Sequence, residues 1–417
     1  GTIEPAAYSV PRSAILSAEG VPEARSDLNA LNLQWSQRLG EVWSLNLSLA
    51  QVRAQIDQPG TFALDSTTFA WPATSAQDGP YYGVFGARLW NRIESTTLSA
   101  SVTGRLALGG AQHTVLAGVD VDRTRDDGFL RFSPNYGLLG LVDITNPVHP
   151  AWVDVDTTGA PDQRNRYRSS AVFMQDHVDF GRLQLLGSLR YNAVKVHDVN
   201  PAYGVANDTS QAKALGRVGA VYALSPQLSA FAGWGQGMRV PTFAVFTQPP
   251  KPELSEQAEL GLRINGSAGL SGTLAWFDLK LKNALAADPA HPGQTIQLNQ
   301  ESSRGFDLDL RWQLSTYTHA LVSLTQQSTQ VKDTGKRFVD VPKTSARIAL
   351  HHDFGAASAL PGLGLGLGLT HHSALAGDAA NSFETPAATV FDAQLSYRVA
   401  NATLGLVVRN ATDKRYW

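Results

Sequence analysis

The sequence predicts an all-β membrane protein: a transmembrane, antiparallel up-and-down β-barrel with about 16 strands. Segments of about ten residues alternate apolar and polar side chains with a period of two, as strands between lipid and a wet lumen do. Short turns and longer loops alternate between these segments, which is typical of outer-membrane barrels. No run of about 18 apolar residues is present, which excludes a helical membrane span.

Composition excludes several other classes. The 417 residues carry a formal net charge of -2, without the basic excess typical of nucleic-acid-binding proteins. The chain has no cysteine, so disulfides, thiolate metal sites and cysteine nucleophiles are excluded. The chain starts at Gly1 without a signal-peptide pattern. We therefore expect it to be processed or to be part of a longer protein.

The expected strands come in pairs along the chain. Residues 1–25 contain three prolines and are expected to form a loop. In the first half, strands are expected at 27–38 and 43–56, 87–108 and 113–124, 167–179 and 183–197, and 214–224 and 228–239. In the second half they are expected at 254–264 and 270–285, 294–314 and 318–332, 341–354 and 362–374, and in a closing hairpin at 386–417.

The closing hairpin shows the two faces most clearly. On the first strand, Phe391 and Leu395 lie on one face and Asp392 lies on the other. On the second strand, Leu406 and Arg409 likewise lie on different faces. The apolar side is expected to contact lipid and the polar side the lumen. Just before it, residues 362–369 alternate Gly and Leu, which predicts a strand with Leu outward and Gly inward.

The longest irregular stretch is expected at 126–165, about forty residues, a length typical of functional or disordered loops. The strand before it follows the short turn at Gly109-Gly110-Ala111. Because short turns lie on the periplasmic side, this loop is expected to lie outside the cell.

Several motifs occur in a characteristic order. Residues 408–417 read V-R-N-A-T-D-K-R-Y-W, residues 113–120 read H-T-V-L-A-G-V-D, and residues 252–261 read P-E-L-S-E-Q-A-E-L-G. Others are F-M-Q-D at 173–176, L-G-S-L-R-Y at 186–191, R-V-G-A-V-Y at 217–222 and S-R-G-F-D at 303–307. Together they resemble the TonB-dependent outer-membrane receptors, in particular the siderophore-receptor branch. Ala411 stands at a usual Leu, and Asn192 at a usual Asp.

The resemblance implies a multi-pass protein of the Gram-negative outer membrane that binds a ferric siderophore and imports it when TonB is energised. It implies the siderophore, the TonB complex and the lipid bilayer as partners of a monomer. It implies neither an enzyme nor a protein-bound cofactor, because the iron belongs to the substrate.

The family's plug domain is not recognisable in this sequence. Plugged transporters have about 22 strands, and about sixteen are expected here, so residues 1–417 are expected to be a partial barrel domain. Its two outer strands would then lack partners. A smaller, complete barrel of sixteen strands is the alternative.

Two sets of candidate site residues follow. In related receptors, loop and plug aromatics hold the iron chelate; otherwise such rings pack loops or form the interfacial girdle. The aromatic candidates are Phe69, Trp71, Tyr81, Tyr82, Phe129, Phe132, Tyr136, Trp152, Phe243 and Phe246. Polar candidates expected to face the lumen, in ion pairs or against a plug, are Arg190, Arg217, Asp307, Asp309, Arg347, Asp392, Arg398 and Arg409.

Other functions stay open at this point. The cargo of such a receptor could be haem, cobalamin or another metal chelate, and a passive porin-like channel would need neither a plug nor TonB. The sequence has no nucleophile-elbow motif. Adjacent histidines at 351–352 and 371–372 would point to opposite faces of their strands, so a zinc site is not expected.

Overall fold

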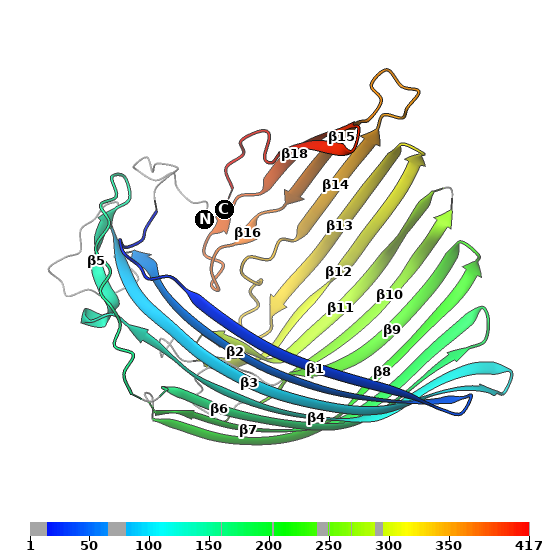
Figure 1. Ribbon diagram of the computed structural model, residues 1–417, viewed down its shortest axis with the longest axis horizontal. Coiled ribbons are helices and arrows are strands. Elements are labelled where there is room, and N and C mark those ends of the chain that lie inside the picture. Colours follow the sequence, from blue (N-terminus) through cyan, green and yellow to red (C-terminus); the bar gives the residue numbers. More distant parts are fainter. Residues whose placement is uncertain are drawn as a thin grey trace.

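The computed structural model describes residues 15–65, 81–159, 161–201, 204–239, 249, 251–267, 269–287 and 295–416. In these residues, seventeen strands form one large sheet, and β16 (Leu375–Ala376) pairs with β17 (Glu384–Thr385) in a separate small one. The large sheet curls around strongly, so that β1 and β15 face each other across its interior (Figure 1). Within the described ranges, no helix has the length and apolarity needed to cross a membrane.

Sixteen strands of the sheet, all except β5, follow one another as an antiparallel meander. They are β1 (Arg25–Leu39), β2 (Trp43–Asp65), β3 (Tyr81–Leu108), β4 (Ala111–Phe132), β6 (Gln163–Asp179), β7 (Leu183–Asn200), β8 (Val205–Ser225), β9 (Leu228–Arg239), β10 (Glu253–Ser267), β11 (Leu270–Ala287), β12 (Thr295–Ser315), β13 (Thr318–Val331), β14 (Thr344–Asp353), β15 (Leu363–His372), β18 (Ala388–Val399) and β19 (Ala402–Val408). β5 (Leu138–Asp143) adds a short pairing at the start of β3. The expected up-and-down topology is confirmed.

The margins of this meander are β1 and β19. β1 pairs with β2, and β19 pairs with β18. Every residue of both strands is exposed. An unpaired strand edge leaves backbone N–H and C=O groups without partners, which the hydrocarbon of a membrane does not tolerate.

The two faces of the sheet differ in chemistry. Val119, Val172 and Tyr191 lie in one row across β4, β6 and β7, and they are 46%, 54% and 52% exposed. One residue further along β4, Asp120 points to the opposite face. Large exposed patches of apolar side chains are unusual on proteins surrounded by water. The apolar face is therefore the lipid-facing outer wall, and the polar face is the lumenal wall.

The closing hairpin has the predicted orientation. Leu406 lies opposite Leu395, which lies opposite Leu365, and Leu406 is 59% exposed on the outer wall. The glycines of β15 lie on the lumenal wall, where Gly366 is opposite Gln394 and Gly368 is opposite Asp392. The Gly-Leu run therefore has leucine outward and glycine inward, as predicted.

The predicted loop limits were wrong on the extracellular side. β4 continues to Phe132 and β6 begins at Gln163, so the irregular stretch is 133–162 rather than 126–165. It contains β5 and a 3-10 turn at Asn135–Gly137. β2 extends to Asp65, beyond the predicted end at residue 56. β3 begins at Tyr81, before the predicted start at residue 87.

The predicted limits differ from the observed ones because the strands continue beyond the hydrocarbon of the bilayer. A tilted strand crosses the hydrocarbon in about 9–11 residues, whereas β3 has 28. Beyond the hydrocarbon, Arg123 and Arg125 replace apolar residues on the outer wall of β4. The alternation of apolar and polar residues stops there, but the pairing with β3 continues as far as Ala87 opposite Phe132.

Candidate ligand-binding mouth and lumen

The lumenal wall is linked by polar contacts that cross more than one strand. Arg190 of β7 donates from Nη1 to Oδ2 of Asp120 on β4, over a distance of 2.6 Å. The side chain passes Phe173 of the intervening β6, with the guanidinium carbon 5.6 Å from the ring centroid. Arg190 therefore joins three strands on the lumenal side.

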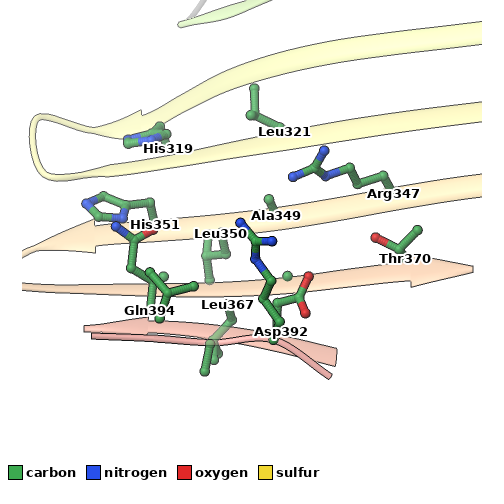
Figure 2. A pocket seen from close by; sticks show the side chains of 15 residues that line it. His319, Leu321, Arg347, Ala349, Leu350, His351, Leu367, Thr370, Asp392 and Gln394 are labelled. Atoms are coloured by element: carbon green, nitrogen blue, oxygen red, sulfur yellow. The ribbon is translucent and has the colours of Figure 1, made fainter. Parts of the chain in front are cut away.

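A groove of about 390 Å³ lies on the lumenal side of β13, β14, β15, β18 and β19. Arg347, Asp392 and Arg409 line it, together with His319 and His351. The two imidazole rings lie 4.9 Å apart, and Figure 2 shows both at one end of the groove, with Arg347 and Asp392 further along. Because Gly366 and Gly368 form part of its floor, side chains from neighbouring strands have room to move.

The other predicted polar residues share this face. Arg217 lines a second lumenal groove, of about 370 Å³, over the glycines of β9. Asp309 accepts a hydrogen bond from the Ser323 hydroxyl over 2.6 Å, and Asp307 is two residues away on the same strand. Arg398 is in phase with Asp392 along β18. The structure thus places all eight predicted lumenal polar residues on the face opposite the exposed apolar side chains.

An aromatic cluster lies on the lumenal side at the extracellular ends of β2, β3 and β4. The Phe62 ring stacks on Phe85 at 5.4 Å, and Phe132 meets Phe62 edge-on at 6.1 Å. Phe85 is 3% exposed, whereas Phe62 and Phe132 are 37% and 48% exposed. The buried ring supports two accessible rings. We call Phe62 and Phe132 the mouth platform.

The outer wall at the same height has its own aromatic cluster. Phe129 stacks on Trp90 at 5.7 Å, and the Arg131 guanidinium lies 4.6 Å from the Phe129 ring centroid. Trp152 packs beside Gly86, where an added Cβ would lie 3.0 Å from its ring and 2.5 Å from the Ser133 hydroxyl. Only glycine fits there. Phe129 and Trp152 therefore face away from the lumen.

Ion pairs anchor the 133–162 loop to this outer wall. Arg131 donates two hydrogen bonds to Asp162, at 2.9 and 2.8 Å, and one to the carbonyl of Thr158 at 2.7 Å. Arg88 lies 3.5 Å from Asp154 of the loop and binds Asp57 of β2 in the same two-pronged way, at 2.7 and 2.8 Å. The hydrogen bond from Arg88 holds the pKa of Asp57 below its ordinary value. The loop is a folded part of the wall.

Comparison with known proteins identifies the family. The family model "TonB dependent receptor-like, beta-barrel" matches residues 6–411. The chain belongs to the TonB-dependent receptors. It is thus part of a Gram-negative outer-membrane barrel, and its apolar outer wall faces the bilayer.

Individual relatives of this TonB-dependent receptor support the assignment. The metal-pseudopaline receptor CntO of Pseudomonas aeruginosa is 29% identical over 100% of this chain and 60% of its own length. The ferrioxamine B receptor of Salmonella typhimurium is 24% identical over 78% of this chain and 47% of its own. The pyoverdine receptor FpvA of P. aeruginosa has a similar fold, with a TM-score of 0.78 at 17% identity, covering 98% of this chain and 60% of that one. These relatives are receptors rather than enzymes. The chain thus spans 60% of the length of CntO.

The predicted aromatic residues occupy different places in the receptor. Phe132 belongs to the mouth platform, and Tyr136 is 89% exposed at the 3-10 turn. Tyr81 and Tyr82 are half-buried where β3 pairs with β5. Phe69, Trp71, Phe243 and Phe246 lie outside the described residues.

Sequence reasoning missed Phe62 and Phe85. The expected strands end at residue 56 and resume at residue 87, so both rings lie between them, yet the cross-strand register of β2 and β3 brings the two rings together. Pairing of two phenylalanines across a hairpin was the available signal, but it required the correct strand limits.

A buried polar cluster lies near the mouth, on the lumenal side of β3, β4, β6 and β7. Asp126 accepts a hydrogen bond from the Asn91 amide at 2.6 Å, and Asp198 lies opposite Asn165. Burial raises the pKa of both carboxyl groups. In the part of the chain that the structure describes, no group of three or more His, Cys, Asp or Glu residues is placed to hold a metal ion.

Proposed function

We propose that the full-length receptor containing this chain imports ferric siderophores across the outer membrane with energy transmitted through TonB. The observation that carries this proposal is the mouth platform: two accessible rings on the lumenal side of a TonB-dependent barrel. Relatives named as receptors for ferrioxamine B and for metal-pseudopaline support a metal-chelate cargo.

The platform suits capture of a chelate. Rigid aromatic rings offer a large contact area and lose little side-chain entropy when a ligand binds. Phe62 and Phe132 would contact the apolar or aromatic parts of the siderophore, with Tyr81 and Tyr136 as further candidates. The iron enters as part of the substrate, and we propose no resident cofactor. We propose the TonB complex and the bilayer as partners of a monomeric receptor.

The lumenal charges would act after capture. Arg347, Asp392 and Arg409 line a groove on the inner wall, where they can contact a plug or a passing chelate. Charged side chains at such a surface keep a polar path hydrated. These residues are proposed to guide rather than to anchor the substrate.

A second candidate cargo is a chelate of another metal. The relative that covers the whole of this chain is named for a metal-pseudopaline complex rather than for a ferric siderophore alone. Uptake assays with the same ligands loaded with iron, zinc or nickel distinguish the two cargoes.

Growth of an iron-starved strain on a panel of siderophores tests the proposal. The strain should lack its own siderophore receptors and carry the full-length gene. We expect growth on at least one ferric siderophore, and loss of that growth when tonB is deleted. Growth or uptake that persists without TonB would instead indicate a passive channel.

A pair of matched variants tests the platform itself. Phe62→Ala combined with Phe132→Ala should weaken ferric-siderophore binding to the purified receptor by about tenfold or more, since each ring supplies about 1 kcal/mol or more of contact. Phe129→Ala removes a ring from the same strand on the outer wall and should bind as the wild type does. Equal loss in both variants would rule out the platform.

A further inference from the structure

Two rows of basic side chains cross the outer wall just beyond the lipid-facing band. In the first row, Arg123 of β4 lies directly opposite Arg168 of β6, which lies opposite Lys195 of β7. In the second, Arg125, Arg166 and His197 lie opposite one another on the same strands. Each residue of the first row is exposed.

Such rows are unfavourable by themselves, because like charges directly opposite each other on neighbouring strands repel. Elsewhere on the outer wall, Arg88 and Arg131 also lie opposite each other, on β3 and β4, but each is bound to an aspartate, Asp57 and Asp162 respectively. On β10, β11 and β12, Lys280 lies opposite Glu256, and Arg304 lies opposite Asp278. A row of cations facing cations therefore points to an anion outside the protein.

The two rows differ in their internal partners. Asp127 accepts from Arg125 at 2.5 Å and from Arg166 at 2.9 Å, which neutralises much of the second row. Among the described residues, Arg123, Arg168 and Lys195 form no ion pair or side-chain hydrogen bond. The first row is thus the one available to an external anion, and it is also the nearer of the two rows to the lipid-facing band.

The position of the first row identifies the class of anion. Arg123 follows Val121 by two residues on the same face of β4, and Val121 lies in the exposed apolar band. The row is on the opposite wall from the lumen, so it does not line the transport path. A ligand there has its charges at the level of the outer-leaflet headgroups and its apolar part against Val119, Val172 and Tyr191.

We propose that Arg123, Arg168 and Lys195 form a binding site for the phosphate groups of an anionic glycolipid of the outer leaflet. Guanidinium groups bind phosphate oxygens in a two-pronged geometry, and an ammonium group adds a point charge. The acyl chains of the same lipid lie along the apolar band below. This site is independent of the siderophore function.

Lipid binding to the purified full-length receptor tests the site. The receptor is stripped of native lipid in detergent and titrated with bisphosphorylated lipid A or with its dephosphorylated form, and bound lipid is counted by native mass spectrometry. Each Lys or Arg near an anionic surface strengthens binding about fivefold. R123Q/R168Q/K195Q should therefore weaken binding of the bisphosphorylated form at least tenfold.

The matched control is K280Q/K282Q/R304Q, which removes three cations from the outer wall of β11 and β12, where acidic residues lie opposite two of them. It should bind the bisphosphorylated lipid as tightly as the wild type. The single variant Arg168→Gln, at the centre of the row, should give a smaller loss in the same direction and provides the test should the triple variant not fold.

Stability against urea gives a second measurement, in which the difference between Arg168→Gln and the wild type should change sign when lipid is added. Without lipid, Arg168→Gln should resist urea at least as well as the wild type, because repulsion within the row is relieved. With bisphosphorylated lipid A, the wild type should become the more stable of the two. The proposal is overturned if the triple variant and the wild type bind equally, if the dephosphorylated lipid binds as tightly, or if inorganic pyrophosphate alone binds as tightly as the lipid.

Discussion

Arg190 and Asp120 form a 2.6 Å ion pair between strands that are not neighbours, because β6 lies between β7 and β4. The pair spans the curved lumenal wall and covers Phe173. Its side chains are about one-third exposed, at 36% and 26%. Such a contact resists flattening of the sheet in a way that backbone pairing between adjacent strands does not.

Breaking this pair should destabilise the receptor modestly. Arg190→Gln is expected to lower the free energy of unfolding by about 1 kcal/mol, since solvent screens a pair that is about one-third exposed. Urea unfolding in detergent measures it, and Asp120→Asn completes a double-mutant cycle with a coupling of about 0.5 kcal/mol or more. Arg217→Gln removes a lumenal arginine that forms no ion pair with any described residue, and it serves as the control. Additive effects of the two substitutions would show that the pair is not coupled.

Neighbouring positions on β19 should differ sharply in their tolerance of charge. Leu406 is on the outer wall, and Val407 lines the lumenal groove. Leu406→Arg should cost about 2–4 kcal/mol where the position lies near the bilayer midplane, whereas Val407→Arg should cost little. Unfolding of the full-length receptor in lipid vesicles measures both. Similar costs at the two positions would contradict the assignment of faces.

The buried carboxyl groups at the mouth predict a stability that rises towards acidic pH. Because burial raises the folded-state pKa of Asp126 and Asp198, both bind a proton more tightly in the folded than in the unfolded state. Their contribution is most favourable below the unfolded pKa of about 4, and it is lost as pH rises through the folded value. Hydrogen exchange of the outer ends of β4, β6 and β7 should therefore slow at low pH, and Asp198→Asn should reduce this dependence.

Asp57 should give the opposite pH dependence of stability. Its pKa is lowered by the hydrogen bond from Arg88, so the pair stabilises the fold above the unfolded pKa of about 4. That stabilisation disappears as pH falls through the lower folded value. Exchange at the outer ends of β2 and β3 should accelerate there in the wild type, and Asp57→Asn should remove the transition. A transition unchanged in the variant would assign it to another group.

Removal of the loop tests the extracellular role predicted for it. Deletion of residues 135–159 from the full-length receptor should leave the barrel able to insert, because the pairing of β3 with β4 ends at Phe132, before the deletion. We expect ferric-siderophore uptake to be lost, since Tyr136 is removed and the mouth is reshaped. Trp152→Ala, on the outer wall, is the milder control. Normal uptake by the deletion would reduce the loop to a cover of the wall.

Much of the barrel could be predicted from the sequence because lipid imposes a simple rule. Wherever a strand crosses the bilayer, one face must be apolar, so Leu406 and Arg409 reveal their sides by spacing alone. The same rule predicted the orientation of the Gly-Leu run of β15 and the lumenal side of Arg190, and the alternation of short turns and longer loops predicted the strand order. Short motifs then indicated the family, which the comparison confirmed.

Only the tertiary structure decided what happens beyond the lipid. There the outer wall carries Arg123 and Arg125 instead of apolar residues, so periodicity no longer marks strands that hydrogen bonding still continues. Because side chains alternate between the two faces along that extension, Phe132 lies on the lumenal side and Phe129 on the outer wall. The sequence offered both equally as candidates for ligand binding. Cross-strand register likewise brings Arg123, Arg168 and Lys195 into one row from three separate strands. Sequence spacing fixes the face of a residue within a strand, but its neighbours across the sheet depend on register, which is set by pairing over long distances in the chain.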